Sequence, residues 1–474
     1  MLVYNIAGEK MAALNLFTVT SLVVKGDLMD YSASLKTPLM AMAYKKFDMN
    51  ATQGDSISEL YPYKWNVIQS LEYDPDTQTN STLDRYQKIT LGATNVTTGT
   101  ALVASLPFSL TAKQMTFFSH ASSVGEFKDY YMTTNGLQIG DSINQAVIDS
   151  CYEWWPDVVG DPTQAVDGYN SLMNINSQIS KMQLMNANRS SGIRIGWHPD
   201  AFSQLQVPYA TTFNESVNAP MLKNGRTSFQ AGLQMYDDNL IRQHQNGTFD
   251  TATNVQIAAT VPQGDINTEY QTFNLKGFTP SATEVLRGGD LIFIGTPANP
   301  VNRLLPIGKQ NSYQYKFFVV LSDDTGSNVI DADGSGNAVI RVRCVPIFQQ
   351  GAMPNPYANI SRQIVVNDIV NLFGGANLTW TKNLVFAKNG FRFANPPIAT
   401  YPLQPNGGGE KLSAFPYERV EKVKIPGTNG MELSFNVSNV TQAGSFKNNW
   451  TTRTICGTLP FENYGFIYAS KAGY

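Results

Sequence analysis

The chain has 474 residues, of which 42% are hydrophobic, 11% aromatic and only 15% charged, and its formal net charge is −3. The aromatic content argues against a disordered chain, and the net charge argues against a nucleic-acid binder that depends on a large basic excess. A surface with few charges suits extensive contact between copies of the chain, because little charge must lose its water on association.

Residues 1–50 contain short apolar pieces between polar breaks, which predicts an N-terminal arm without a core of its own. No stretch of the chain reaches the ~18 apolar residues of a membrane span. Glu9 and Lys10 stand where a signal peptide needs its apolar region. Met11 offers a second start of translation, so the sequence leaves the start open between Met1 and Met11.

A long hairpin is predicted within residues 51–112. Residues 64–73 alternate between apolar and polar side chains, and residues 86–91 resume the pattern of a strand. The polar stretch 74–82 between them forms a turn that faces water. Because a lone two-stranded hairpin is marginally stable in water, we expect this hairpin to lie against another subunit.

The clearest helix of the sequence is predicted to begin near Ser142. Ser142 and Gln145 fit a capping box, in which the hydroxyl and the amide each bond a free backbone N–H. Apolar residues follow at steps of three and four, which gives the helix one apolar stripe. Pro156 is expected to end this helix.

Two further helices and a strand are predicted in the next segment. Asp161 is expected to cap a second helix, with Pro162 in its first position. The apolar run 192–197 predicts a short buried strand. His198 then leads into a third helix that begins at Pro199.

From residue 246 onward, short strand-like runs alternate with turns rich in Asp and Gly, which predicts a small antiparallel barrel or sandwich. Mixed α/β sequence flanks this region on both sides, so we expect an inserted domain whose two ends lie close together. A short helix and a β-rich return follow. The predicted strands of the barrel are 255–261, 270–275, 290–295, 315–321 and 339–345, the helix is 360–373, and the later strands are 380–386, 391–394, 431–437, 451–456 and 464–469.

Few residues form a catalytic pattern. The block Gly140-Asp141-Ser142-Ile143 resembles the nucleophile block of certain esterases, but their partner histidine lies near the C-terminus, whereas the last histidine here is His244. We therefore interpret Ser142 as a helix cap. His198 is interpreted as part of a helix start and His244 as part of a solvated face, and together with His120 they lack the spacing of metal ligands.

Two acidic segments have both a structural and a functional interpretation. Residues 331–336 resemble the start of a calcium loop, but Ile340 stands where the chelating Glu is needed, so a hairpin turn is favoured. Residues 152–157 combine aromatic side chains with Glu153 and Asp157, as sugar-binding sites do. Their aromatic side chains also complete the stripe of the preceding helix, which favours core packing.

The basic residues and the cysteines indicate no site either. The basic residues of the C-terminal part are scattered, and a solvated face is favoured over a surface for a polyanion. The cysteines lie far apart, which favours buried free thiols in a reducing compartment. The sequence thus predicts that the chain is not an enzyme and has no catalytic, cofactor-binding or metal-ligating residues. The scattered basic residues are Lys382, Lys388, Arg392, Lys411, Arg419, Lys422 and Lys424, and the cysteines are Cys151, Cys344 and Cys456.

The order of these elements, and several short blocks, resemble the major capsid proteins of tailed bacteriophages. One block is Ile193-Arg194-Ile195-Gly196-Trp197-His198-Pro199-Asp200-Ala201-Phe202, which is similar to a strand, turn and helix of the family's axial domain. The block 280–295, with Leu286-Arg287-Gly288-Gly289-Asp290-Leu291-Ile292-Phe293-Ile294-Gly295, is similar to a barrel strand that follows a Gly-Asp turn. The other blocks are residues 11–15, 231–240, 357–360, 380–397 and 451–469.

Within that family the chain resembles the podovirus type of coat protein. The resemblance implies an α+β, HK97-like capsid fold with an N-terminal arm, an E-loop hairpin, a spine helix, an axial domain and an inserted antiparallel β-barrel. The implied divisions are the arm at 1–50, the E-loop hairpin at 51–112, a peripheral domain with the spine helix at 113–157, the first part of the axial domain at 158–247, the barrel at 248–349 and the axial and peripheral return at 350–474.

The resemblance also implies a function. The chain would be a major capsid protein that assembles through hexamers and pentamers into the icosahedral head shell around a double-stranded DNA genome. A scaffolding protein and a portal would be its partners, packaged DNA would be contacted weakly and without sequence specificity, and no membrane would be involved. It would be located in the virion after assembly in the host cytoplasm. The turns at 263–269 are the expected contact of the barrel with other subunits.

Two alternatives stay open at this point. Another β-rich virion protein, such as a tail or fibre component, would form tubes or trimers instead of closed shells. A carbohydrate-active enzyme is suggested by the aromatic and acidic residues at 152–157. The sequence does not predict the host, the triangulation number, decoration proteins or the residues that govern maturation.

Overall fold

The structure is a computed structural model that describes most of the central part of the chain and several strands on either side. Its described residues divide into two compact units, Met1–Ile57, Thr97–Val147 and Arg392–Thr458 in the first, and Ser58–Val96, Ile148–Phe391 and Leu459–Tyr474 in the second. The described residues are 44–47, 56–60, 93–97, 102–111, 133–183, 193–211, 229–230, 232–264, 268–306, 310–348, 357–387, 390–394, 417–424, 432–442, 447–460 and 462–473.

A six-stranded sheet with the order β1-β22-β25-β24-β23 contains most of the described residues of the first unit, and β4 also pairs with β25. Its central strands are long. β24 has 11 residues and β25 has 14, against about 5–6 in an average strand. The strands are β1 (Tyr44–Phe47), β4 (Leu102–Thr111), β22 (Phe391–Ala394), β23 (Tyr417–Lys424), β24 (Glu432–Gln442) and β25 (Lys447–Pro460).

A mixed sheet with the order β5-β26-β21-β6-β8-β7 forms part of the second unit, and β9 also pairs with β21. The pairs β26–β5 and β6–β8 are parallel, and β21 pairs antiparallel with β26, β6 and β9. The strands are β5 (Val158–Gly160), β6 (Ile193–Trp197), β7 (Phe229–Gln230), β8 (Leu233–Asp237), β9 (Gln243–Gln245), β21 (Thr379–Ala387) and β26 (Gly465–Lys471).

Apolar side chains from this sheet and from its helices form its core. Nearly all of β21 is buried, as expected of a central strand. The ring of Trp155, which follows helix α5 (Thr133–Trp154), stacks on Phe386 of β21 at 5.5 Å between centroids. Helices α6 (Gly168–Lys181) and α7 (Pro199–Thr211) contact each other and bury their apolar faces.

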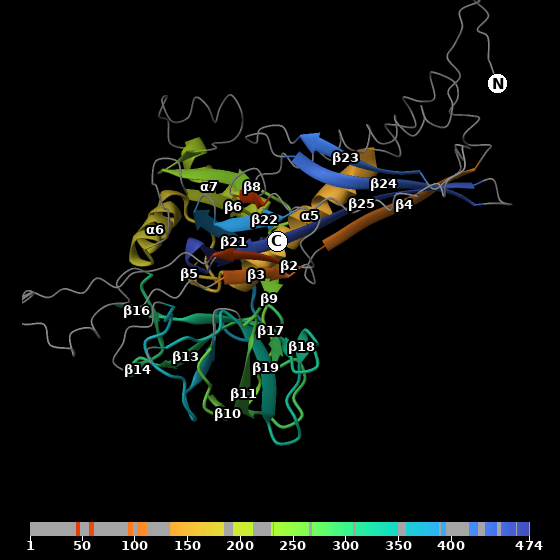
Figure 1. The fold of residues 1–474 in the computed structure, drawn as a ribbon. Coiled ribbons are helices and arrows are strands. Elements are labelled where there is room, and N and C mark those ends of the chain that lie inside the picture. The colour runs from red at the N-terminus through yellow and green to blue at the C-terminus, as the bar shows by residue number, and fades with distance from the viewer. Residues whose placement is uncertain are drawn as a thin grey trace, which may run out of the picture. The chain divides into compact units, whose positions relative to one another are not determined.

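The barrel is a sheet that nearly closes on itself (Figure 1, green and teal). Its path is β10-β11-β19-β17-β13, and β20 pairs with the other edge of β13. The segment before β20 returns to β10, where Asn367 N–H donates to Ile257 O and Ile257 N–H donates to Asp368 O, both at 2.9 Å. The strands are β10 (Thr251–Ile257), β11 (Gln271–Phe278), β13 (Leu291–Thr296), β17 (Phe317–Asp323), β19 (Asn337–Arg343) and β20 (Val370–Leu372).

Short pairs of strands complete the described part of the chain. β2 pairs with β3, β12 with β18 and β15 with β16, while β14 pairs antiparallel with the end of β13. The inner face of the barrel is apolar, with Phe273 and Phe318 packed edge to face at 5.5 Å. The bounds are β2 (Ser56–Leu60), β3 (Ala93–Thr97), β12 (Leu286–Arg287), β14 (Asn299–Pro300), β15 (Asn302–Leu304), β16 (Asn311–Tyr315), β18 (Val329–Ile330) and a 3-10 turn η5 (Glu462–Tyr464).

The chain enters and leaves the barrel at adjacent residues, as expected of an inserted domain. Gln245 at the end of β9 is the register partner of Thr379 at the start of β21. One residue farther into the barrel, Asn246 N–H donates to Leu378 O at 3.0 Å. The side chain of Asn246 fixes the same point, because its amide donates to Phe373 O and Gly375 O and its oxygen accepts from the indole N–H of Trp380.

The predicted strand at 192–197, the five predicted barrel strands and the strands predicted between 380 and 469 are confirmed to within five residues at each end. The third helix begins at Pro199, as predicted. The predicted arm and hairpin lie largely outside the described residues. Residues 64–73, 74–82 and 86–91 are among them, so the hairpin remains a prediction.

The prediction that a helix begins at Ser142 is wrong. α5 begins at Thr133, and Ser142 is an exposed residue inside it. Gly136 and Gly140 lower the helix propensity of its first turns, which favoured a later start on sequence grounds. That preference is only about 1 kcal/mol for each glycine, and the later turns of α5 bury Val147 and Cys151 in the structure.

The second helix also begins later than predicted. Asp161 accepts the backbone N–H of Thr163 at 2.8 Å and thereby closes a turn instead of capping a helix. α6 begins at Gly168, after Asp167, whose carbonyl accepts the first helical N–H from Ser171. The Ser171 hydroxyl accepts the N–H of Asp167 in return, so these two residues define the helix start.

The helix predicted at 360–373 is absent from the structure, which describes all of these residues. Ile360, Ile364 and Val370 have apolar spacing that resembles a helix, but each is buried in the barrel core. Asp368 accepts the N–H of Val365 in a turn, and the chain then forms β20. The core of the barrel, and not the local periodicity, determines this backbone.

Candidate functional site: two buried polar clusters between the barrel and the mixed sheet

Two clusters of buried polar side chains join the barrel to the mixed sheet. The first, the His244 cluster, consists of Tyr152, His244, Asp290 and Lys382. The second, the Arg303 cluster, consists of Asp157, Arg303, Lys316, Asn359, Glu462 and Asn463. Charged groups are costly to bury unless they are paired, so each cluster constrains how its two sides meet.

The centre of the His244 cluster is the carboxylate of Asp290, which is fully buried in the turn before β13. Its Oδ1 lies 2.7 Å from Nε2 of His244 on β9. Its Oδ2 accepts the backbone N–H of Arg287 at 2.7 Å and that of Gly247 at 3.2 Å. The carboxylate therefore exchanges its lost water for three protein donors.

Lys382 is the second charged group of this cluster. It lies on β21, and its ammonium donates to the carbonyl of Gly289 and lies over the rings of Trp380 and Tyr152 at 5.2 and 5.8 Å. Burial lowers the pKa of Lys382 to about 7, although Asp290 acts in the opposite direction. Burial, together with Lys382, also lowers the pKa of His244.

The backbone at Gly289 allows this close approach. Its φ of +97° lies in the region that favours glycine, and a Cβ there would lie 3.1 Å from Cε1 of His244. Tyr152 completes the cluster from α5, because its hydroxyl donates to Lys382 O at 2.8 Å and accepts the N–H of Arg242 at 3.1 Å. Burial raises the pKa of Tyr152.

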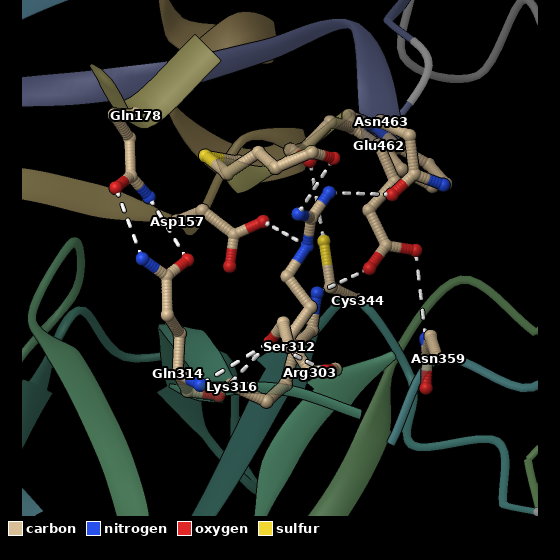
Figure 2. Close-up of polar contacts among 12 residues, drawn as sticks. Asp157, Gln178, Arg303, Ser312, Gln314, Lys316, Cys344, Asn359, Glu462 and Asn463 are labelled. Carbon is tan, nitrogen blue, oxygen red and sulfur yellow. Dashed lines mark hydrogen bonds and ion pairs between the residues drawn. The ribbon is translucent and has the colours of Figure 1, made fainter. Parts of the chain in front are cut away.

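Arg303 of β15 is the centre of the second cluster (Figure 2). Its Nε lies 2.9 Å from Oδ2 of Asp157, its Nη1 donates to Met182 O at 3.2 Å, and its Nη2 donates to Oδ1 of Asn463 at 2.8 Å. The barrel thus contributes the cation, and residues next to β5, α6 and β26 contribute the acceptors. The side chains of Arg303 and Asp157 are 2% and 4% exposed, so the pair is held away from water.

A second ion pair lies beside it. Lys316 is fully buried, and its ammonium is paired with a carboxylate oxygen of Glu462, whose other oxygen is 3.5 Å from the amide nitrogen of Asn359. Burial alone would lower the pKa of Lys316, but the carboxylates of Glu462 and Asp157 raise it above its ordinary value. Lys316 therefore remains charged at neutral pH.

Further contacts extend this cluster at its margins. The amides of Gln178 on α6 and Gln314 on β16 donate to each other at 3.2 and 3.1 Å. The thiol of Cys344 lies 3.3 Å from Trp154 O, and Arg343 pairs with Glu153 at 2.8 Å. These are structural interactions, since the charged groups of both clusters contact protein partners.

The aromatic and acidic segment Tyr152–Asp157 packs as predicted. Tyr152, Trp155 and Asp157 are buried, and Arg343 lies over the ring of Trp154 at 5.1 Å. The two carboxylates that a glycosidase would need are each engaged by an arginine, Glu153 by Arg343 and Asp157 by Arg303. The geometry does not favour the carbohydrate-active enzyme.

The structure contradicts the interpretations of Ser142 and His244 and confirms that of His198. Ser142 lies inside α5, so its interpretation as a cap is wrong. His198 precedes α7 as expected. Its carbonyl accepts the N–H of Phe202, and its Nδ1 accepts the N–H of Asp200 at 3.3 Å. The solvated face predicted for His244 is wrong, since β9 alternates and turns this ring inward against Asp290. His120 lies outside the described residues.

The turn predicted at 331–336 is confirmed, but it is not a hairpin turn, because β18 before it pairs with β12 and β19 after it pairs with β11 and β17. Asp333 Oδ1 accepts the N–H of Ser335 and of Asn337, both at 2.8 Å, and these bonds lower the pKa of Asp333. Gly336 has a φ of +77°, as the turn requires. Among the described residues, no group of three or more His, Cys, Asp or Glu side chains could hold a metal ion.

Of the basic residues assigned to a solvated face, Lys382 is buried, so that interpretation is wrong for it. The side chains of the others, from Lys388 to Lys424, lie outside the described residues. Cys151 and Cys344 are free and buried, as predicted, and burial raises the pKa of each thiol. The side chain of Cys456 is not among those described. No helix in the described part of the chain is long and apolar enough to cross a membrane.

Sequence reasoning missed Asp290, Arg303 and Lys316. A signal was present, because Arg303 is followed by Leu304-Leu305 and Lys316 precedes Phe317-Phe318-Val319-Val320. A cation within an apolar strand has to be buried with a partner or turned to water. The partners, Asp157 and Glu462, are more than 140 residues away in sequence, so no local pattern could identify them.

No protein-family model matches the chain, and no curated protein matches it. Among solved structures, the chain is similar to one from Mycobacterium phage Che8, with 7% identity, a TM-score of 0.38 and coverage of 88% of this chain and 85% of that chain. It is similar to the mature capsid of bacteriophage PhiM1, with 8% identity, a TM-score of 0.38 and coverage of 92% and 86%. It is also similar to the capsid of Ralstonia phage GP4, with 7% identity, a TM-score of 0.38 and coverage of 91% of this chain and 87% of that chain.

Proposed function

We propose that this chain is a major capsid protein, which assembles with copies of itself into the icosahedral head shell of a tailed phage around double-stranded DNA. The observation that carries the proposal is the insertion of a nearly closed barrel at one point of a mixed sheet, between β9 and β21. This architecture, together with the blocks near Ile193 and Leu286, supports the podovirus type of coat protein with an HK97-like fold.

In this proposal the long helix α5 is the spine helix and the mixed sheet with α6 and α7 is the axial domain. The proposed divisions of the chain include the arm at 1–50 and the E-loop hairpin at 51–112, as the sequence resemblance implies. The barrel, implied at 248–349, is proposed to continue through β20, which pairs with β13. The role is structural and not catalytic, and it needs no cofactor. The two buried clusters hold the barrel in one orientation, which a repeating shell contact requires.

The proposed partners are other copies of the chain in hexamers and pentamers, a scaffolding protein, a portal and, weakly, the packaged DNA. The low net charge of −3 fits a shell that does not bind DNA tightly. The turns around Gln263 and Glu269 are the proposed contact of the barrel with its neighbours. The proposed location is the virion, after assembly in the host cytoplasm.

Electron microscopy of the expressed chain, alone and with its neighbouring genes, tests this proposal. We expect closed shells of uniform size. Long tubes or trimers under every condition would instead favour a tail or fibre component, the remaining virion alternative.

Deletion of residues 74–81 tests the role of the hairpin in the same assay. The variant is expected to fold and to remain largely unassembled, because weak contacts act together in a shell and the loss of one in every subunit is multiplied. Sedimentation separates shells from free subunits, and circular dichroism verifies that the variant folds. Normal shells from this variant would contradict the proposed contact.

A further inference from the structure

The His244 cluster lies where the barrel is joined to the mixed sheet. His244 is two residues before Asn246, the first residue of the crossing, and Lys382 is three residues after Thr379, the first residue of the returning strand β21. Asp290 belongs to the barrel and binds both His244 and the N–H of Gly247. Any movement of the barrel away from the sheet has to separate Asp290 from His244.

Lys382 makes the same connection in the opposite direction. Its ammonium donates to Gly289 O, so a strand of the sheet binds the barrel turn that carries Asp290. The side chain of Lys382 is 4% exposed in this state. If the barrel moved away, the ammonium would gain water and lose Gly289 O, whereas the rings of Trp380 and Tyr152 would stay on its own side of the joint.

We propose that the His244 cluster is a proton-sensitive attachment, which holds the barrel on the mixed sheet more firmly above neutral pH than below it. The proposal concerns the described second unit and does not depend on the capsid function. Its basis is the geometry of a buried amine and a buried imidazole on one side of a joint and a buried carboxylate on the other.

The direction follows from where the proton is bound. In the attached state burial holds the pKa of Lys382 at about 7, whereas a hydrated lysine has an ordinary value of 10.5. Separation therefore takes up a proton between these two values, and lowering the pH favours it. His244 acts in the same direction at lower pH, because burial also lowers its pKa.

The neighbouring charges do not reverse this direction. Asp290 favours the charged form of Lys382, but the value of about 7 already includes its effect, and Arg242 acts against it. Two of the remaining charges nearby are balanced by partners, Arg242 by Asp149 of α5 and Arg287 by Glu284. The charged groups that act on Lys382 or His244 are Arg242 of the segment before β9 and Arg287 and Asp290 of the barrel. Behind them, Asp149 and Cys151 of α5 act on Tyr152, and Glu284 pairs with Arg287.

Hydrogen exchange of the purified full-length chain, measured by mass spectrometry and corrected for intrinsic exchange rates, tests the proposal. The informative amides are those of Gly247 and Arg287, which donate to Asp290, and that of Asn246, which donates to Leu378 O. Between pH 8.5 and pH 6.5 their corrected exchange is expected to rise about 20-fold, which is what a pKa change from 10.5 to about 7 gives.

Lys382→Met removes the titrating amine and keeps the length of the side chain. The rise is expected to be largely lost, and only the part that His244 contributes should remain. Lys276→Met is the matched control, because Lys276 is on β11 and its ammonium donates to Asn367 at the surface of the barrel. This control is expected to keep the 20-fold rise.

A second variant, Lys382→Gln, keeps a donor for Gly289 O and should also remove most of the rise. Pepsin peptides that cover residues 242–247 and 285–291 report the result, and peptides of β11 and β19 report whether the barrel itself stays folded. An unchanged rise in both Lys382 variants, or no rise in the unaltered chain, would overturn the proposal.

Discussion

Arg303 shows how a charged residue is accommodated between two parts of the chain. All of the described partners of its side chain belong to the other side of the junction, namely Asp157, Met182 and Asn463. A buried ion pair of this kind adds little net stability, because both charges lose their water. Its effect is on specificity, since a displaced barrel would leave both charges buried and unpaired.

Replacement of Arg303 tests this interpretation. Arg303→Leu leaves Asp157 buried without its cation and is expected to lower the free energy of unfolding by about 3–5 kcal/mol in urea titrations. Addition of Asp157→Asn should recover a large part of this loss, because the unpaired charge is removed. Arg341→Leu is the matched control at a surface contact and should cost less than about 1 kcal/mol. Equal losses for Arg303→Leu and Arg341→Leu would contradict the account.

Lys382 is expected to make global stability depend on pH in a defined direction. Its pKa is about 7 in the folded chain and 10.5 when hydrated, so the unfolded chain binds more protons between these values and stability rises with pH over that range. Lys382→Met should therefore stabilise the chain at pH 7, by about 2 kcal/mol after the loss of the donor to Gly289 O. A urea titration series from pH 7 to pH 9.5 checks this, and an unchanged slope in the variant would refute it.

Whether the position of a single residue could be predicted depends on how far away in sequence its interaction partner lies. The turn at Asp333 and the helix start at His198 were predictable, because their hydrogen bonds are made within four residues. The positions of His244 and Arg303 were not, because their partners are 46 and more than 140 residues away in sequence. A polar residue in a short strand can face water or a distant partner, and alternation alone does not distinguish the two.

At the scale of the elements, the strands of the barrel were the most predictable part. They alternate and are separated by Asp- and Gly-rich turns, which are local signals. The segment from Ile360 to Val370 was not predictable, because its apolar spacing fits a helix and only the closed barrel turns it into bends and a strand. Helix ends were shifted for a related reason, as at Thr133 and Gly168, where weak propensities were outweighed by packing and side-chain bonds.

Two fragments test which residues the barrel needs. A fragment of residues 246–378 contains the whole buried core of the barrel, from Val255 to Val370, and is expected to unfold cooperatively on heating. A fragment of residues 246–349 lacks β20 and the buried Ile360 and Ile364, so one side of β13 stays unpaired, and we expect it to remain unfolded. Far-UV circular dichroism follows the unfolding of both fragments. Neither fragment contains tryptophan, so near-UV circular dichroism reports on their tyrosines. Equal stability of the two fragments would show that the barrel ends near residue 349.

At the scale of the whole molecule, the proposal is that the chain becomes part of a shell by contact with its own copies. Low surface charge, long strands in the first unit and a barrel fixed at one point of the mixed sheet all suit repeated contacts of defined geometry. The sequence could suggest this role through its order of elements. It could not suggest the two buried clusters, which depend on the meeting of segments far apart in the chain.

A three-dimensional reconstruction of the particles formed by the expressed chain tests this central claim most directly. The account predicts a closed shell of hexamers and pentamers, in which residues 51–112 of each subunit lie across a neighbouring copy. A chain that stays monomeric under all conditions, with these residues packed on its own body, would contradict it.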